Sequence, residues 1–310
     1  MTSFQRSLAP EIIDRLKEDP LFAELKTDCK KGDVFPVVRG GYMSFYYAGG
    51  SLFKYDANGF STHIKYAFVP KGSDDCYLSQ ENLQSKKGEL ETNFVDGYKK
   101  IKKRCELYAG DEDAGISNLY KYSPVLGEGN IYLVDIEVAF TAENDNKIGK
   151  ERKSTDRIDI LLYDNEKGQL LFCEAKHFSN NEIRASKGRT PAVVGQLNRY
   201  NDQIAEKKEQ ICVQYEKRFD VLYDLFGVRL NPPKKIYPHC GLLLFGFDND
   251  QRKGRLDEHL PSLEAHKYYA KGNLKGNLDG KKGISAETLY KCLTDECKTN
   301  HCGPLCWRKK

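Results

Sequence analysis

Three short apolar segments with charged residues in their interior constrain most strongly what this chain can fold into. Residues 131–140, 157–164 and 169–178 are rich in β-branched, leucine and aromatic residues, and polar loops separate them. Apolar runs of this length between polar loops are typical of buried strands. The residues at 164–168, DNEKG, are typical of a tight turn, so the second and third segments are predicted to pair as a hairpin.

A helix and a fourth strand are predicted to follow this hairpin. Thr190-Pro191 combines a hydroxyl N-cap with proline at the first helical position, which is typical of a helix start. Apolar residues then recur at helical spacing to about residue 226, and the buried strand HCGLLLFGF is predicted at 239–247. Helix, three strands, long helix and strand, in this order, predict an α/β core with a mixed central sheet.

An N-terminal β-rich module is predicted before this core. Residues 34–69 are rich in aromatic residues and are interrupted by dipeptides that favour tight turns: Gly40-Gly41, Gly49-Gly50 and Asn58-Gly59. We predict three or four antiparallel strands there, after a short amphipathic helix that ends at Pro20, and a surface helix within 79–108. The aromatic residues of the module either form the core of this small sheet or stack on nucleic-acid bases: Tyr42, Phe45, Tyr46, Tyr47, Phe53 and Tyr55.

Composition adds a few limits. The chain is 39% hydrophobic and 30% charged, as soluble globular proteins are, and its net charge of +4 neither requires nor excludes a nucleic-acid partner. No apolar run approaches about 18 residues, and the N-terminus lacks a signal-peptide core, so we expect a cytoplasmic protein without a membrane partner. We divide the chain into an N-terminal helix and β-rich module (1–78), a core (79–260), and a basic loop with a cysteine-rich tail (261–310).

Charged residues inside two of the predicted strands mark the candidate site. Glu174 and Lys176 are two apart, so they project from one face of their strand, and Asp159 lies between two isoleucines in the preceding strand. Burying such groups costs free energy unless a partner or a metal compensates. In the hairpin Asp159 approaches Glu174, and a hard cation such as Mg²⁺ or Mn²⁺ would relieve the repulsion between the two carboxylates.

This pattern resembles the PD-(D/E)xK nuclease superfamily, in which an aspartate precedes Glu-x-Lys on the next strand. In the following helix, Gln196-Leu-Asn-Arg-Tyr200 is similar to the Q-x-x-x-Y element of its RecB-like branch, and residues four apart share one helical face. The resemblance covers residues 131 to about 247 and departs from the motif at Ile158, which replaces proline. It implies a three-layer α/β/α core like that of restriction endonucleases.

The resemblance also implies a role for each motif residue. Asp159, Glu174 and the main-chain carbonyl of Ala175 would hold Mg²⁺ or Mn²⁺, and Lys176 would orient or deprotonate the attacking water. A bound metal supplies the charge stabilisation and the nucleophile that phosphodiester hydrolysis needs. The helix would contribute Gln196 and Tyr200 to the same site.

A further acid usually completes such a site. Residues 131–140 place Asp135 and Glu137 on one strand face, and we favour Glu137 over Glu89 and Glu91 of the preceding helix.

The expected function is therefore metal-dependent hydrolysis of phosphodiester bonds, in DNA rather than RNA, in restriction, defence or repair. For the motif residues themselves, the alternative is a salt bridge on a solvated face of an edge strand. For the whole protein, one alternative is a catalytically inactive nuclease fold that binds nucleic acid or another protein, and another is a zinc-dependent assembly module in the tail with the core as its scaffold. A homodimer is compatible with the sequence. The chain has no G-x-x-x-x-G-K-[ST] motif, so ATP-driven translocation would need a partner protein.

Two more sites are predicted outside the catalytic motif. Arg184, Lys187 and Arg189 precede the Gln196 helix, where a phosphate backbone would pass, although a solvated loop is the alternative. Four cysteines lie within fifteen residues of the tail and could hold a structural Zn²⁺, with unliganded thiols as the alternative: Cys292, Cys297, Cys302 and Cys306.

Overall fold

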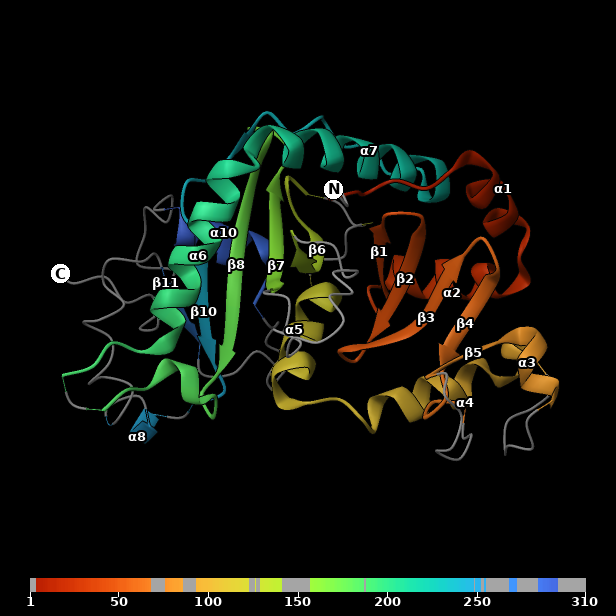
Figure 1. Cartoon of the computed structure of the whole chain (residues 1–310), viewed down its shortest axis with the longest axis horizontal. Coiled ribbons are helices and arrows are strands. Elements are labelled where there is room, and N and C mark those ends of the chain that lie inside the picture. Colours follow the sequence, from red (N-terminus) through yellow and green to blue (C-terminus); the bar gives the residue numbers. More distant parts are fainter. Residues whose placement is uncertain are drawn as a thin grey trace, which may run out of the picture. The chain divides into compact units, whose positions relative to one another are not determined.

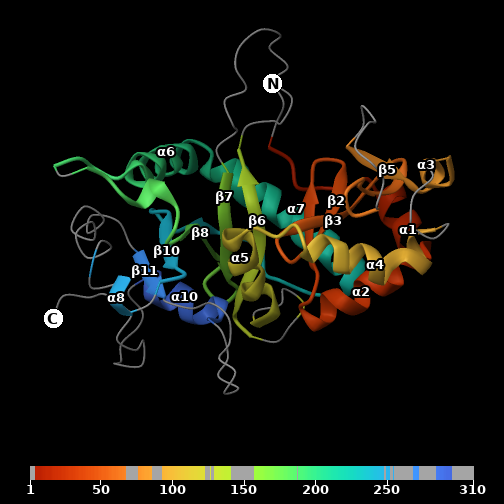
Figure 2. The ribbon, with the colours of Figure 1, turned by 90° about the horizontal axis from the view of Figure 1, so that it is seen from below.

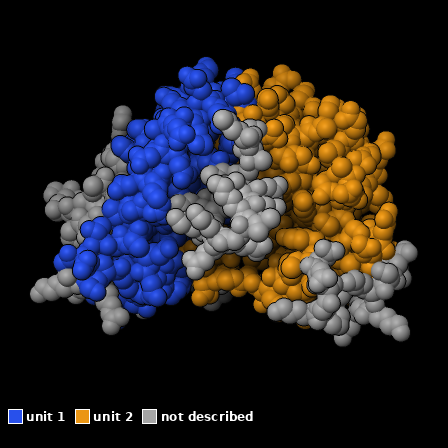
Figure 3. All heavy atoms as spheres, in the orientation of Figure 1, with its two compact units in different colours: residues 1–4, 129–213, 231–310 blue, residues 5–128, 214–230 orange. Residues whose placement is uncertain are grey.

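Two β-sheets, each with its own helices, make up the described part of the chain (Figure 1). The computed structural model describes residues 4–67, 76–85, 93–122, 126, 129–140, 157–186, 188–247, 249–251, 254, 268–271 and 284–294. Two compact units are distinguished (Figure 3): unit 1 comprises residues 1–4, 129–213 and 231–310, and unit 2 comprises residues 5–128 and 214–230. The predicted mixed α/β class is confirmed.

Unit 2 is built on a five-stranded antiparallel meander in which each strand pairs with the next along the chain. Ala48 and Gly49 connect two of the strands with φ angles of 49° and 85°, the conformation that a two-residue hairpin turn requires. Four strands lie within the predicted region 34–69 and a fifth follows it: β1 Phe35–Arg39, β2 Tyr42–Tyr47, β3 Gly50–Asp56, β4 Gly59–His63 and β5 Tyr77–Ser79.

Five helices accompany this sheet: α1 Pro10–Glu18, α2 Pro20–Lys31, α3 Gln80–Ser85, α4 Phe94–Glu106 and α5 Asp111–Tyr122. Pro20 begins α2, and Asp19 caps this helix by accepting a hydrogen bond from the amide of Leu21 at 2.9 Å. The surface helix with one buried stripe, predicted within 79–108, is confirmed as α4, which buries Tyr98, Ile101 and Cys105. It begins only at Phe94, and the short helix α3 before it is separate. Helix α5 was not predicted.

Aromatic side chains form much of the core of unit 2. Phe45 and Phe53 are fully buried, and their rings lie 6.0 and 5.9 Å from the ring of Phe60. Phe53 also contacts Phe94 of α4 at 5.4 Å, edge to face. Phe45, Phe53 and Tyr55 therefore pack in the core of this small sheet and are not exposed for stacking on bases, whereas the other three aromatic residues named from the sequence are half-buried: Tyr42, Tyr46 and Tyr47.

A cluster of hydrogen bonds between largely buried side chains joins α2 to α4. The hydroxyl of Tyr98 and the ammonium of Lys102 both donate to Oδ2 of Asp28, at 2.7 and 2.6 Å. Burial raises the pKa of Asp28, but Lys102 and Tyr98 outweigh this effect and hold the pKa below its ordinary value. The Asp28 carboxylate therefore stabilises the fold above its unfolded pKa of about 4, and this contribution is lost as the pH falls through the lower folded pKa.

Asp28→Asn is expected to lower the free energy of unfolding by about 1–2 kcal/mol at neutral pH, because the acceptor of the hydrogen bonds from Tyr98 and Lys102 loses its negative charge. The difference from wild type should shrink on acidification, since the wild-type carboxylate is then protonated as well. Urea denaturation at neutral pH and at about pH 2.5 measures both values. A difference that does not change with pH would contradict the assignment.

Unit 1 is built on a six-stranded mixed sheet in the order β11-β10-β8-β7-β6, with β9 also paired to β8. Strands β6, β7 and β8 run antiparallel, whereas β10 is parallel to β8 and to β11. The predicted mixed sheet is thus confirmed, with these strands: β6 Ile131–Ala139, β7 Arg157–Asp164, β8 Gln169–His177, β9 Lys235–Ile236, β10 Gly241–Phe245 and β11 Tyr268–Lys271. Strand β11 corrects the assignment of its residues to a basic loop.

Helices α6 and α10 lie on opposite faces of this sheet (Figures 1 and 2). The long helix predicted up to residue 226 is divided at Lys207 into α6 and α7. The remaining helical elements are α6 Ala192–Glu206, α7 Lys208–Phe226, the 3₁₀ turn η1 Asn181–Ile183, α8 Asn249–Gln251 and α10 Ala286–Leu293. None of the helices in the described ranges has the length and apolar character needed to cross a membrane.

The boundaries of the two units differ from those of the three ranges expected from the sequence. Helices α4 and α5 belong to unit 2, although residues 79–128 were assigned to the core. Helix α7 begins in unit 1 and continues into unit 2, where its buried residues Val221 and Leu225 join the core. The sequence could not predict this division of α7, because helical periodicity shows which face of a helix is apolar but not which unit that face belongs to.

Candidate active site

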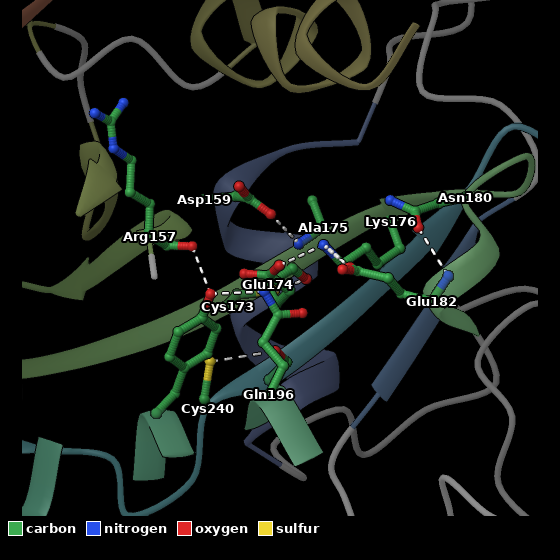
Figure 4. Close-up of polar contacts among 12 residues, drawn as sticks. Arg157, Asp159, Cys173, Glu174, Ala175, Lys176, Asn180, Glu182, Gln196 and Cys240 are labelled. Carbon is green, nitrogen blue, oxygen red and sulfur yellow. Dashed lines mark hydrogen bonds and ion pairs between the residues drawn. The ribbon is translucent and has the colours of Figure 1, made fainter. Parts of the chain in front are cut away.

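The hairpin of β7 and β8 carries the predicted catalytic residues (Figure 4). Ile160 pairs with Cys173 and Asp164 with Gln169, and Asp164 closes the turn by accepting a hydrogen bond from the amide of Lys167 at 2.9 Å. The same register, carried one residue beyond Ile160, places Asp159 opposite Glu174. Directly opposed residues project from the same face of a sheet, so the two carboxylates belong to one face.

A hydrogen bond from the backbone amide of Ala175 in β8 to the side chain of Asp159 in β7 also connects these two strands. Backbone pairing between β7 and β8 ends at Ile160 and Cys173. Beyond it, the amide of Ala175 also faces β7, and it donates a hydrogen bond to Oδ2 of Asp159 at 2.8 Å. An extended residue directs its N–H and C=O toward the same neighbouring strand. The main-chain carbonyl of Ala175 therefore lies on the side of Asp159, where the resemblance requires a ligand.

Lys176 is held between two carboxylates. Its Nζ lies 2.7 Å from Oε1 of Glu174 and 2.8 Å from Oε2 of Glu182. The Glu174 side chain is 1% exposed and that of Lys176 is 7% exposed, whereas Glu182 is 48% exposed. Burial lowers the pKa of Lys176, but Glu174, Glu182 and Asp159 more than offset this effect and raise it above its ordinary value. Lys176 is therefore a fixed ammonium in this arrangement.

Glu182 was not among the residues predicted from the sequence. It lies on the 3₁₀ turn η1, which the side chain of Asn180 caps by accepting a hydrogen bond from the amide of Glu182 at 2.9 Å. This turn reverses the chain directly after β8 and brings Glu182 back to Lys176 (Figure 4). Turn-forming asparagines after the strand are the only sequence signal for it, and they do not specify the partner.

Gln196 and Tyr200 lie on one face of α6, as their spacing predicts. The amide of Gln196 donates to the Tyr200 hydroxyl at 2.8 Å, and this hydroxyl donates to the carbonyl of Arg157 at 2.7 Å. Arg157 is two residues before Asp159, so the buried Tyr200 braces the start of β7. Asn201 adds a second anchor by accepting a hydrogen bond from the amide of Cys240, next to β10, at 2.7 Å.

Glu137 lies in register opposite Asp159, but another residue holds its carboxylate. Strand β6 pairs Ile136 with Ile160 and Val138 with Ile158, after a bulge near residue 134. Glu137 has an uncommon positive φ of 48°, and its Oε2 lies 3.3 Å from the Arg157 guanidinium. The buried acid of this strand is Asp135, whose Oδ1 accepts a hydrogen bond from the amide of Ile136. Glu89 and Glu91 lie outside the described residues.

The three basic residues predicted to contact phosphates differ in their surroundings. Arg184 folds back on its own loop, where it donates to the carbonyl of Phe178 and lies 4.7 Å from the Phe178 ring. Arg189 is exposed, and Lys187 lies outside the described residues. Arg184 thus has a role in loop packing, and Arg189 is accessible for a contact with a phosphate.

Only one of the four tail cysteines falls within the described residues. Cys292 lies in the last turn of α10 and is buried. Cys297, Cys302 and Cys306 lie outside the described residues, so the zinc site stays a prediction.

Oxygen donors define the metal chemistry that this site fits. Among the residues that the structure describes, no cluster of three or more histidine, cysteine, aspartate or glutamate side chains could hold a metal. Asp159, Glu174 and the carbonyl of Ala175 offer two carboxylates and one backbone oxygen at neighbouring positions. This set fits Mg²⁺ or Mn²⁺, because Mg²⁺ is commonly bound through one or two carboxylates while it keeps several waters.

Comparison of the whole chain with known proteins gives no family to which it can be assigned. Neither the family models, nor the curated proteins, nor the solved structures contain a match. The class of protein is therefore inferred from the chemistry of the β7–β8 hairpin and α6.

Proposed function

We propose that this protein is a Mg²⁺- or Mn²⁺-dependent nuclease that hydrolyses phosphodiester bonds, with DNA rather than RNA as its substrate. The observation that carries the proposal is the buried β8 strand, on which Glu174 and Lys176 lie beside the Asp159 carboxylate that holds the Ala175 amide. Helices on both faces of the mixed sheet support a three-layer core like that of restriction endonucleases. Restriction, defence or repair would be the setting.

Each residue has a role that its surroundings support. Asp159, Glu174 and the carbonyl of Ala175 would hold the metal, which when bound polarises a phosphoryl oxygen and lowers the pKa of a coordinated water. The Lys176 ammonium keeps a positive charge beside the carboxylates, where it can orient an anionic phosphate. Gln196 and Tyr200 position Asp159 indirectly, through the Arg157 carbonyl.

A second candidate function is that of a catalytically inactive nuclease fold that binds nucleic acid or another protein. The ion pair of Lys176 with Glu174 favours it, because the ammonium compensates for the burial of the Glu174 carboxylate without a metal.

Cleavage assays on plasmid, linear and single-stranded DNA and on RNA separate the two functions. Purified wild-type protein is expected to cleave at least one DNA substrate with Mg²⁺ or Mn²⁺ and to lose this activity in EDTA. Circular and linear substrates distinguish internal cleavage from degradation at ends. The inactive-fold candidate replaces the proposal if folded wild-type protein cleaves none of these substrates and Asp159→Asn leaves Mn²⁺ binding unchanged.

A further inference from the structure

Exposed tyrosines and basic side chains gather at one edge of unit 2. Tyr77 of β5 is 49% exposed and Tyr108, just after α4, is 48% exposed, whereas Tyr66 is buried. Leu107 beside them is 69% exposed. We call this edge the aromatic-basic patch, and it consists of His63, Lys65, Tyr66, Tyr77, Arg104 and Tyr108.

The rings of the patch follow one another in a row. Tyr77 lies 5.6 Å from His63, His63 lies 5.7 Å from Tyr66, and Tyr66 lies 6.1 Å from Tyr108. Tyr66 is buried and forms the floor, so the exposed rings of Tyr77 and Tyr108 stand at the two ends. Partial burial, and then the charge of Lys65, lower the pKa of His63, which keeps its ring uncharged at neutral pH.

Two cations are fixed within this row. The ammonium of Lys65 lies 5.0 Å from the Tyr66 ring and 4.9 Å from the Tyr108 ring. The Arg104 guanidinium lies 5.6 Å from the Tyr108 ring, and it donates hydrogen bonds to the Tyr108 hydroxyl and to the carbonyl of Lys65, both at 3.4 Å. Cations and aromatic faces are thus held together by contacts within the patch.

Helix α4 extends the positive charge away from the patch. It carries five basic residues against Asp96 and Glu106, and Lys99, Lys100 and Lys103 are exposed. Lys102 is not part of this face, because it binds Asp28. The exposed lysines and Arg104 therefore form a positive surface that leads to the rings.

We propose that the aromatic-basic patch binds a single-stranded stretch of nucleic acid, with bases stacked on Tyr108 and Tyr77 and phosphates along the lysines of α4. Aromatic rings beside a positively charged surface are the arrangement that binds unpaired strands, since every base has a face that stacks and every nucleotide has a phosphate. A duplex hides its base faces, and an acidic peptide has no flat rings to match both tyrosines. The proposal rests on the proposed function only for the class of ligand.

Fluorescence anisotropy in EDTA tests binding without cleavage, with a labelled single-stranded DNA, the matching duplex and a labelled polyglutamate peptide as probes. Tyr108→Ala is expected to weaken binding of the single strand about tenfold, whereas Tyr108→Phe, which keeps the ring, should bind like wild type. Replacing Lys99, Lys100 and Lys103 by glutamine should reduce the slope of log affinity against log salt by about 2.

Tyr223→Ala is the matched control, because Tyr223 is 46% exposed in the same unit and Arg229 lies 4.8 Å from its ring. Its affinity for the single strand should equal that of wild type, and thermal unfolding shows whether each variant is folded. Equal affinities of Tyr108→Ala and Tyr223→Ala, tighter binding of the duplex, or tighter binding of polyglutamate would each overturn the proposal. Patch-dependent binding by a protein that cleaves nothing would overturn the nuclease function alone.

Discussion

Lys176→Met is expected to lower the free energy of unfolding of unit 1 by about 3–5 kcal/mol. Methionine keeps much of the length of the side chain but removes the ammonium that lies 2.7 Å from Glu174. Glu174 is almost completely buried, so its carboxylate would then be left without the cation that compensates for its lost hydration. Hydrogen exchange of the β7 and β8 amides reports this loss within unit 1.

Three further variants define the cause of this loss. The double variant Glu174→Gln with Lys176→Met should recover much of the stability, because no unpaired charge remains. Glu182→Gln should cost less than about 1 kcal/mol, since its partly exposed ion pair is screened by solvent. Lys291→Met is the matched control, because the Lys291–Glu287 pair of α10 is exposed at both ends. If Lys176→Met is no more destabilising than Lys291→Met, the buried pair does not stabilise unit 1.

Asp159→Asn is expected to reduce metal-dependent cleavage at least about a hundredfold. Substitution of a residue that only hydrogen-bonds to a metal ligand already lowers metal affinity or activity about 10–100-fold, and Asp159 would be a ligand itself. Asparagine keeps a side-chain oxygen that can accept the hydrogen bond from the Ala175 amide, so the fold should be retained. The charge that would attract the metal is removed. Initial rates across an Mn²⁺ titration show whether the loss is one of affinity or of turnover.

Asp164→Asn provides the matched comparison for this variant. Asp164 lies on the same strand, is buried, and also accepts a hydrogen bond from a backbone amide, but it stands at the turn, at the other end of β7. Its cleavage rate should equal that of wild type. Equal losses in the two variants would make the effect structural, and full activity in Asp159→Asn would assign the cleavage to other residues or to a contaminant.

The parts of the site that follow from local periodicity could be predicted from the sequence. The turn at 164–168 sets the register of β7 and β8, and that register places Asp159 opposite Glu174. The spacing of Gln196 and Tyr200 places them on one helix face, where the structure has them joined by a hydrogen bond. Both features depend on residues that are close in sequence, so alternation and helical spacing are sufficient.

Features that depend on an interrupted pattern or on distant contacts could not be predicted in this way. The bulge in β6 and the positive φ of Glu137 break strict alternation, and the Glu137 carboxylate pairs with Arg157 on the neighbouring strand. Glu182 reaches Lys176 only because a 3₁₀ turn reverses the chain. Strand β11 is short, and its parallel pairing with β10 leaves no local signature.

The hydrogen bond from the Ala175 amide to Asp159 makes one backbone proton sensitive to the position of a single carboxylate. A hydrogen bond from an amide to a backbone carbonyl of the neighbouring strand breaks only when the strands separate. A hydrogen bond to a side-chain carboxylate can break by rotation about the bonds of that side chain. Any ligand that draws the Asp159 carboxylate away therefore changes the environment of this amide and leaves the pairing from Ile160 onward intact. The ¹⁵N–¹H resonance of Ala175 is thus a built-in indicator of occupancy at the site, readable in the unmodified protein.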